Sequence, residues 1–373
     1  MRTKHDNPFK PSFGSRPPIL VGRDGIVDDV RLGIAEGPGS PLRAMAIVGP
    51  RGIGKTVLLD AMRDAAALEG WVAVATTASE NMLADILEQT EHAIAHIKNK
   101  SSTRKITGIT AAGFGLSSTM TEQQKPGWRV QMAALLEVLA KHGTGLLITV
   151  DEVRAGIAEL EQFCKTLQHF ITEQRDIAVV FAGLPAQFRQ LASTPGLTFI
   201  WRAERQQLGS VPLEYVRTAF REIITAGHRK ADTLVIEAMA QATGGYPFLI
   251  QLVGYHTWRQ SDAVEISLKD VAEGVDIAKR RLGSSVAAYA VADLSPTDRT
   301  FLVKMAQDDG VSKVRDIAER MNVSLNYASV YRGRLLEAGV ITAPRNGEVE
   351  FAIPYLRDYL REHAATLVWV DNE

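Results

Sequence analysis

The strongest constraint on the fold comes from eight consecutive residues, 49–56, which read GPRGIGKT. This segment satisfies G-x-x-x-x-G-K-[ST] at every fixed position, a pattern typical of loops that bind phosphate groups. An apolar run, Ala44–Val48, precedes the segment, and an amphipathic stretch, Val57–Ala66, follows it. A buried strand, a glycine-rich loop and a helix are therefore predicted in that order.

The chemistry of phosphate binding explains the residue types in this loop. Glycines let the backbone curl until consecutive N–H groups point at phosphate oxygens. Lys55 is expected to reach the β- and γ-phosphates of a nucleotide, and the Thr56 hydroxyl to ligate Mg²⁺. The helix that follows adds the positive end of its dipole. The predicted nucleotide-binding residues here are Gly49, Pro50, Arg51, Gly52, Ile53, Gly54, Lys55, Thr56 and Val57.

A second apolar run ends in two adjacent acids, Asp151 and Glu152, 95 residues after Thr56. Taken alone, such a strand end is more often only a solvated terminus. Downstream of a phosphate-binding loop, the first acid is expected to hold Mg²⁺ and the second to polarise a water for attack on the γ-phosphate. We therefore predict Thr56 and Asp151 as metal ligands, and Glu152 and Lys55 as catalytic residues.

Alternating apolar and amphipathic stretches predict an α/β fold class, with a parallel sheet covered by helices on both faces. The strands expected in this sheet are Ala44–Val48, Trp71–Thr76, Leu146–Val150 and Ile177–Ala182. After about residue 205 the expected elements are helices, and residues 292–363 predict three helices, a β pair and a closing helix. The predicted division is an extended basic arm (1–18), a core (19–205), a helical lid (206–290), a third unit (291–366) and a tail (367–373).

Charge is nearly balanced, with 42 Lys and Arg against 43 Asp and Glu, which excludes a chain that coats nucleic acid through uniform basicity. Along the sequence it is uneven, because the insert at 98–129 holds six basic residues against one acid and the arm at 1–16 adds a charge of +3. Partial alternation predicts a β-hairpin in the insert. A solvated loop is the plainer interpretation. The alternative is a contact to the DNA backbone, made by Lys98, Lys100, Arg104 and Lys105.

The single cysteine, Cys164, excludes an intramolecular disulfide and is expected to be buried. The N-terminus is polar, and no run of about 18 apolar residues is present that could span a membrane. These features predict a cytoplasmic protein without a membrane partner.

Through the loop and the Asp151-Glu152 strand end, the sequence resembles P-loop ATPases of the group that contains the AAA+ and the signal-transduction (STAND) ATPases. The resemblance covers most of the chain. It implies ATP or ADP and Mg²⁺ as ligands, ATP hydrolysis that is slow or stimulated by a partner, and a homo-oligomer or protein partner. Val21, Gly22 and Arg23 resemble the segment that helps enclose adenine in initiator-type AAA+ proteins, and an ordinary turn is the alternative.

The family pattern continues with one departure. Residues 244–247, GGYP, resemble the Gly-x-Pro module of STAND and archaeal-type ATPases, which implies that Pro247 lies near the nucleotide. The strand at 177–182 lacks the polar sensor residue usual in AAA+ proteins, so sensing there is expected to be absent or mediated by the backbone. Arg205, or else Arg202, lies where the family places an arginine that reaches the nucleotide of a neighbouring subunit, and a surface ion pair is the alternative.

The third unit resembles a winged helix-turn-helix, with helices expected at Val314–Met321 and Leu325–Glu337 and a wing at Val340–Ile353. Residues 296–363 contain ten basic and ten acidic residues, so this unit has no excess positive charge with which to attract DNA. Winged helices also bind proteins. If it binds DNA, the predicted contacts are Asn326, Tyr327, Ser329, Arg332, Arg334 and Arg345.

Two functions remain in competition. The first is a Mg²⁺-dependent ATP-binding and hydrolysing AAA+-like switch that acts on double-stranded DNA through the winged helix and the basic insert. The second is a STAND-like signalling or defence ATPase whose winged helix binds a protein partner. The Gly-x-Pro module favours the second, and the absence of a long repeat array after the winged helix favours the first. A small-molecule kinase would leave both C-terminal units unexplained.

Overall fold

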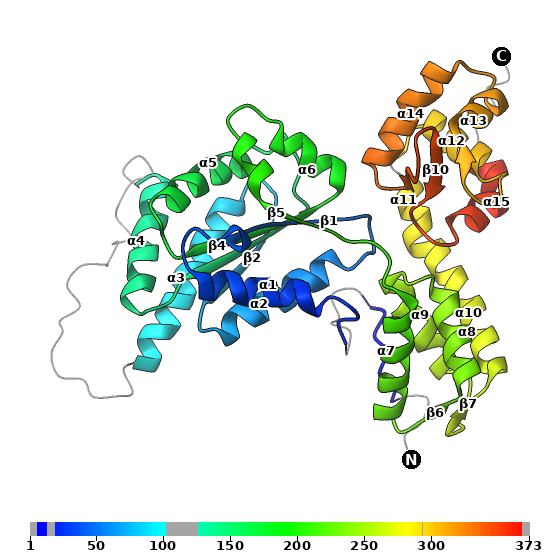
Figure 1. Ribbon diagram of the computed structural model, residues 1–373, viewed down its shortest axis with the longest axis horizontal. Coiled ribbons are helices and arrows are strands. Elements are labelled where there is room, and N and C mark those ends of the chain that lie inside the picture. Colours follow the sequence, from blue (N-terminus) through cyan, green and yellow to red (C-terminus); the bar gives the residue numbers. More distant parts are fainter. Residues whose placement is uncertain (1–5, 13–18, 102–125, 293, 368–373) are drawn as a thin grey trace.

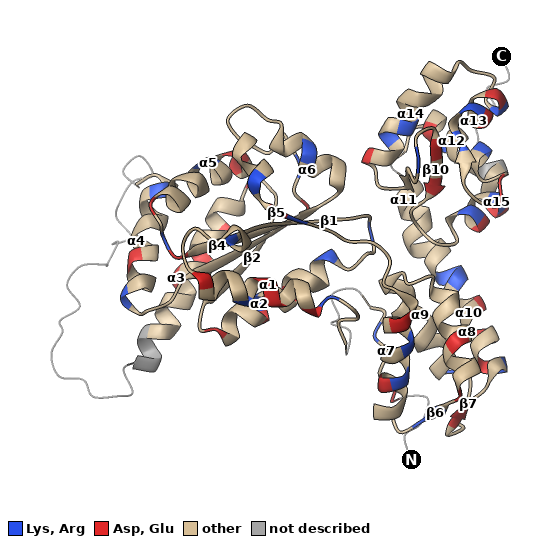
Figure 2. Ribbon diagram, in the orientation of Figure 1, with Lys and Arg blue, Asp and Glu red and all other residues tan. Residues whose placement is uncertain are grey.

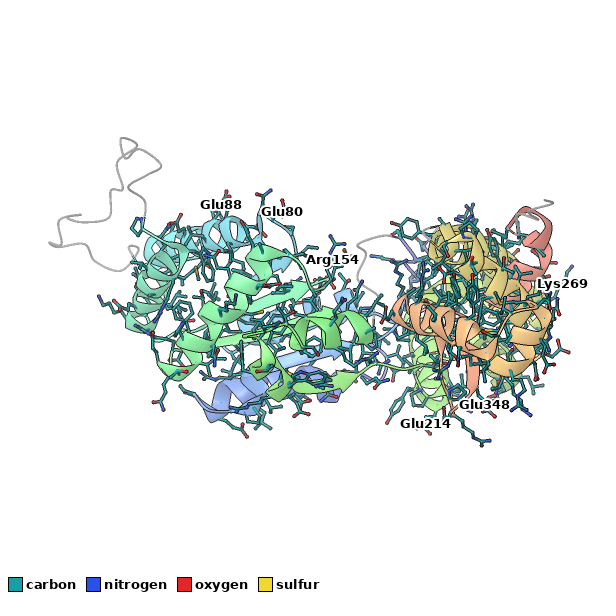
Figure 3. The ribbon with its side chains drawn as sticks, turned by 90° about the horizontal axis from the view of Figure 1, so that it is seen from above. Glu80, Glu88, Arg154, Glu214, Lys269 and Glu348 are labelled. Carbon is teal, nitrogen blue, oxygen red and sulfur yellow. The ribbon has the colours of Figure 1, made fainter. Side chains whose placement is uncertain are left out.

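The structure is a computed structural model that describes residues 6–12, 19–101, 126–292 and 294–367. An α/β core forms one body, and the helical lid and the third unit stack against each other in a second body beside it (Figure 1). Seen from above, the two bodies are joined through a narrow waist (Figure 3).

The core is built on a five-stranded parallel sheet of order β2-β3-β4-β1-β5, which confirms the predicted fold class. The register pairs Val48 with Gly183 and Val150 with Phe181, so the carboxyl ends of β1 and β3 flank that of β4 at one edge. The strands are β1 (Ala44–Val48), β2 (Val72–Thr77), β3 (Leu146–Asp151), β4 (Ile177–Gly183) and β5 (Glu204–Gln207).

Strand β5 was not predicted from the sequence. Its four residues read ERQQ, and they alternate between half-buried and exposed positions. As an edge strand, β5 pairs only with β1 and needs no apolar run on both faces. The prediction that strands stop near residue 205 was therefore wrong, because β5 extends across that boundary.

Helices cover both faces of the sheet. Met45 and Ile47 of β1 point into one apolar cluster with α1 and α2, whereas Ala46 and Val48 point into a second cluster with α3, α4 and α5. This alternation is the period of two expected for a strand buried on both sides. The helices are α1 (Asp24–Glu36), α2 (Lys55–Leu68), α3 (Met82–Ser101), α4 (Trp128–Lys141), α5 (Ala158–Thr172) and α6 (Pro185–Ala192), with 3₁₀ turns at Pro41–Arg43 and Thr198–Arg202.

The lid consists of four helices and a parallel pair of two-residue strands. The prediction that the lid contains only helices was therefore wrong. The pair is β6 (Lys230–Ala231) and β7 (Glu265–Ile266), and the helices are α7 (Leu213–Ala226), α8 (Thr233–Thr243), α9 (Pro247–Trp258) and α10 (Leu268–Leu282). A π-helical segment, Gly283–Ala287, continues α10 into α11 (Ala288–Ala292). The predicted boundary at 290 therefore falls inside a helix.

The described part of the N-terminal arm, residues 6–12, packs against the lid and contains no helix or strand. Phe9 is 1% exposed and contacts the rings of Phe220 and Trp258. Asn7 Nδ2 donates to the Tyr255 carbonyl at 2.9 Å, and the Lys10 N–H donates to Gln251 Oε1 at 3.1 Å. Of these residues only Phe9 is buried, whereas Asp6, Lys10 and Ser12 are exposed, so one aromatic side chain attaches an otherwise partly exposed arm to the lid.

The third unit contains the predicted helices, but a third short strand joins the predicted β pair. A capping box between Ser295 and Asp298 starts its first helix, and its strands form an antiparallel sheet of order β8-β10-β9. The elements are α12 (Pro296–Met305), β8 (Ser312–Lys313), α13 (Val314–Arg320), α14 (Leu325–Glu337), β9 (Ile341–Thr342), β10 (Glu348–Phe351) and α15 (Leu356–Leu367).

The third unit also contacts the other two. A Cβ on Gly339, just after α14, would lie 3.1 Å from Leu184 Cδ2 and 3.8 Å from Pro50 Cα. The Tyr355 hydroxyl donates to the Ala242 carbonyl of α8 at 2.6 Å. The end of α14 therefore lies beside the glycine-rich loop. None of the helices in the described part of the chain is long and apolar enough to cross a membrane.

Candidate nucleotide-binding site

The glycine-rich loop joins the carboxyl end of β1 to the first turn of α2. Gly52 and Gly54 have φ values of +71° and +89°, a backbone conformation that residues with a Cβ rarely adopt. Gly54 is the N-cap of α2 and has no side chain with which to cap the helix. The first N–H groups of α2 therefore face the loop without a side-chain cap, as an anion site at a helix N-terminus requires.

Lys55 lies over the loop. Its Nζ donates to the carbonyls of Gly49 at 2.9 Å and Pro50 at 2.8 Å. Burial lowers the pKa of Lys55 to about 8, because desolvation disfavours the ammonium form; Asp151 and Glu152 oppose the shift and Arg51 adds to it. Added negative charge at this position would favour the ammonium form, which is the response expected of a phosphate-binding lysine.

The two predicted metal ligands meet. Thr56 Oγ1 donates to Asp151 Oδ2 at 2.6 Å, and Asp151 Oδ1 accepts from the N–H of Glu152 at 2.8 Å. Hydroxyl and carboxylate oxygens are the donors that Mg²⁺ prefers, so this pair suits a site completed by phosphate and water. Among the described residues, no group of three His, Cys, Asp or Glu side chains could hold a metal ion by itself.

Glu152 lies at a sharp bend of the chain. Its φ is +54°, in the left-handed region, and the next residue returns to the sheet with the Val153 N–H donating to the Ala182 carbonyl at 2.9 Å. A non-glycine residue is held there at a cost in backbone energy, which makes the position notable at the end of a strand. The bend leaves Glu152 exposed beside the Thr56–Asp151 pair.

A cavity of about 290 Å³ adjoins this pair between α2, α3 and the ends of β2 and β3. Arg63 and Thr149 line it, and Arg63 Nη1 donates to Thr149 Oγ1 at 2.7 Å. Gln89, also in the lining, pairs with both the N–H and the carbonyl of Ala75 on the edge strand β2. The space beside the predicted metal ligands is therefore polar.

The end of β4 contacts the loop through its backbone. The Gly49 N–H donates to the Gly183 carbonyl at 3.3 Å, and a Cβ on Gly183 would lie 2.8 Å from Val153 Cγ2. No room remains there for a polar sensor side chain, in agreement with the sequence of this strand.

The lid reaches the loop through residues 245–247. The Tyr246 hydroxyl donates to the Arg51 carbonyl at 2.7 Å, and Pro247 begins α9, with its Cβ 3.8 Å from a Cβ built on Gly54. Pro247 was predicted to lie near the nucleotide, whereas no role was predicted for Tyr246. The only sequence signal for Tyr246 was its place between the paired glycines and the proline.

The predicted base segment lies at the junction of core and lid. Val21 is half-buried and packs on the apolar cluster shared by the two. Gly22 has a φ of +64° and faces Val211 and the Tyr215 ring. Arg23 Nη2 donates to the Gly209 carbonyl, and burial lowers the pKa of Arg23. The segment is thus attached to the start of the lid.

Arg205 packs on aromatic rings of its own subunit. Its guanidinium lies 4.7 Å from the centre of the Trp201 ring and 5.6 Å from that of Phe188. Arg202 is exposed at the end of a 3₁₀ turn. Cys164 is fully buried as predicted, and burial raises its pKa.

The residues predicted to contact DNA divide into two groups. Asn326, Tyr327, Ser329 and Arg345 are exposed. Arg332 is half-buried, and Arg334, although exposed, is engaged in an ion pair in which its Nη2 lies 2.9 Å from Asp298 Oδ2. Basic and acidic residues are interspersed over this unit (Figure 2).

The basic insert lies largely outside the described residues. The side chains of Lys98 and Lys100, at the end of α3, are not described, nor are Arg104 and Lys105. The predicted hairpin also lies outside the described residues, except that residues up to Ser101 are helical.

Comparison with known families agrees with this geometry. A family model described as an AAA domain matches residues 41–192. The chain contains an AAA-type P-loop ATPase domain. The match to the AAA domain runs from just before β1 to the end of α6 and so includes both the loop and the Asp151-Glu152 strand end. A second model, described as a domain of unknown function, matches residues 284–360. No curated protein matches the chain.

Solved structures extend the likeness beyond the AAA domain. A Walker-type ATPase of Pyrococcus abyssi is 12% identical with a TM-score of 0.65, over 93% of this chain and 97% of that chain. The ORC2 protein of Aeropyrum pernix, in ADPNP–ADP complexes, is 14% identical with a TM-score of 0.60, over 96% of each chain. At these identities the similarity establishes the fold, which this ATPase shares with them over nearly its whole length.

Proposed function

We propose that the chain is a Mg²⁺-dependent switch that binds and hydrolyses ATP and acts on DNA through its third unit and basic insert. The observation that carries the first part is the 2.6 Å hydrogen bond between Thr56 and Asp151, with Lys55 and Glu152 beside it. The phosphate loop and the acidic strand end, 95 residues apart, meet at one edge of the sheet.

The residues divide the chemistry among them. The loop N–H groups and Lys55 would bind the phosphates, and Thr56 and Asp151 would hold Mg²⁺, which when bound neutralises phosphate charge. Glu152, exposed beside them, would orient a water for in-line attack. Complexes of the Aeropyrum pernix ORC2 protein with ADPNP and ADP support ATP and ADP as ligands.

Assembly and location belong to the same proposal. Arg205, which is exposed although its guanidinium lies on the Trp201 ring, would serve a neighbouring nucleotide in a homo-oligomer. Arg202, also exposed, is the alternative for that role. The proposed location is the cytoplasm.

The DNA-binding role is proposed for the exposed part of the third unit. Its element order supports a winged helix, in which α14 would enter the major groove and the turn at 345–347 would form the wing. Asn326, Tyr327, Ser329 and Arg345 are then the exposed contacts of this unit, and the basic residues of the insert are proposed to add to them.

The same helix supports a second candidate, a protein partner. Three apolar or aromatic side chains of α14 are about half exposed, with fractions of 47% for Leu325, 45% for Tyr327 and 60% for Val330. Apolar side chains gathered on one helix end are typical of a protein contact. Under this reading the chain is a STAND-like signalling or defence ATPase.

A DNA-binding experiment distinguishes the two candidate functions. Binding of duplex DNA by the full chain is measured at several salt concentrations, with ADP and with a nonhydrolysable ATP analogue. DNA binding that weakens with salt and differs between nucleotides supports the switch on DNA. No binding at low salt in either nucleotide state would contradict it and leave the protein partner.

A further inference from the structure

Tyr246 links the lid to the phosphate loop although the two are 195 residues apart in sequence. Its side chain is 1% exposed, and its hydroxyl donates to the Arg51 carbonyl at 2.7 Å. Burial also raises the pKa of Tyr246, so the hydroxyl keeps its proton and can act as a donor. A buried tyrosine hydroxyl needs such a partner, and here the partner is loop backbone.

The loop and the lid are shaped around this contact. A Cβ on Gly52 would lie 2.0 Å from the Tyr246 hydroxyl oxygen, so the loop approaches closely only because residue 52 is a glycine. On the lid side, the Val211 N–H donates to the Gly245 carbonyl at 2.8 Å, and a Cβ on Gly245 would lie 2.1 Å from the Val211 carbonyl oxygen. The ring of Tyr246 therefore has little freedom to move independently of the core–lid junction.

The hydrogen bond fixes the orientation of a peptide unit. The described peptide bonds contain no cis bond, and in a planar trans peptide the N–H of one residue points opposite to the preceding carbonyl. With the Arg51 carbonyl held toward the lid, the Gly52 N–H must point away from it. The guanidinium of Arg51, which is exposed, lies 5.8 Å from the centre of the exposed Tyr289 ring on α11.

We propose that Tyr246 is a positioning residue for nucleotide binding, which orients the Arg51–Gly52 peptide through its hydroxyl and couples the lid to the phosphate loop. When the lid moves, this bond is lost, the peptide is free to turn and the phosphates are held less tightly. The inference rests on the nucleotide-binding role proposed above. It adds a residue of the lid to a site otherwise built from the core.

Replacing the tyrosine by phenylalanine isolates the hydroxyl, because Tyr246→Phe keeps the buried ring. Tyr355→Phe is a matched control, since the Tyr355 hydroxyl also donates to a backbone carbonyl, that of Ala242, at 2.6 Å. Each variant loses one tyrosine–carbonyl hydrogen bond, but only the first bond ends on the loop. Both variants should therefore lose similar thermal stability.

Release of a fluorescent ADP analogue from the full-length protein, followed by stopped flow, is the test. We expect release from Tyr246→Phe to be about fivefold faster than from the wild type, the effect of losing one neutral hydrogen bond. Tyr355→Phe should release at the wild-type rate. Wild-type release from Tyr246→Phe, or equally faster release from both variants, would overturn the inference. If the wild type binds no nucleotide, the proposed function and this inference fail together.

Amide hydrogen exchange of the wild type gives a second test that needs no variant. ADP should slow exchange in a peptide covering residues 244–250 of the lid as well as in the loop. If ADP slows exchange in the loop but not in the lid peptide, the proposed coupling is contradicted. The proposed nucleotide binding is not contradicted by that result.

Discussion

The phosphate loop and helix α14 are both predicted binding surfaces, but they differ in which of their groups can face a ligand. In the loop, the groups that face the expected ligand are backbone N–H groups and a lysine whose own partners are loop carbonyls. In α14, Arg334 is already paired with Asp298, and the end of the helix lies against α6 and the loop. Backbone N–H groups stay directed at the ligand whatever packs around the loop. Side chains can instead be taken up by contacts within the protein, so a site made of them is harder to predict from the sequence.

The largest effect is expected at the acid after β3. Glu152→Gln keeps the size of the side chain but cannot accept a proton, so the turnover number for ATP should fall about 1,000-fold while ATP binding is retained. Phosphate release under saturating ATP, together with a binding isotherm, measures both. Glu80→Gln is a suitable control, because Glu80 points outward to solvent (Figure 3). Unchanged turnover in Glu152→Gln would refute the assigned role.

Removal of the loop lysine should be the next largest effect. Lys55→Ala deletes a charged donor from a buried position, and nucleotide affinity should fall about 100-fold, as for loss of strong charge-assisted hydrogen bonds. Titration with a fluorescent ADP analogue measures the change. Lys141→Ala, at the exposed end of α4, should bind as the wild type does. Equal affinity in both variants would show that the loop does not bind phosphate.

The exposed residues of α14 should give a smaller effect if DNA is the partner. Asn326→Ala and Tyr327→Ala should each weaken duplex binding about tenfold, the size of one lost base contact, with no change in the urea midpoint of unfolding. Binding at fixed salt measures this. Variants that bind DNA normally but lose a protein partner would favour the rival function.

Arg334 should show the opposite behaviour. Arg334→Ala leaves the buried Asp298 with only Ser295 as its partner among the described contacts, so the free energy of unfolding should fall by about 1 kcal/mol. DNA binding should change little, because the guanidinium is already engaged. Urea unfolding and DNA binding of the same preparation test this, and a loss of DNA binding without a loss of stability would place Arg334 at the DNA surface.

Structural features that depend on neighbouring residues could be predicted from the sequence, whereas several that depend on contacts between distant residues could not. The loop, the acidic strand end and the helices expected at Val314–Met321 and Leu325–Glu337 follow from residue type and spacing, and the structure has each of them within one residue of the expected position. Strand β5 was missed because an edge strand of Glu, Arg and Gln has no apolar pattern.

Other features were missed because their partners lie far away in the chain. Phe9 lies in a mostly polar arm, and its burial follows only from the packing of the lid helices around it. Tyr246 finds its partner in the loop, and the pairing of Arg334 is visible only once α12 and α14 are packed. The spacing of residues within one segment does not reveal which distant residues they will contact.

The docking of Phe9 has a consequence for the order of events during synthesis. Asn7 and its partner Tyr255 are separated by 248 residues, so the arm leaves the ribosome long before its binding surface exists. At about 5–20 residues per second, the arm waits on the order of 10–50 seconds for the lid helices. The arm is therefore made before the helices on which it packs and can dock only after they have folded, so a bulky group fused close to it would have to be accommodated in that docking step.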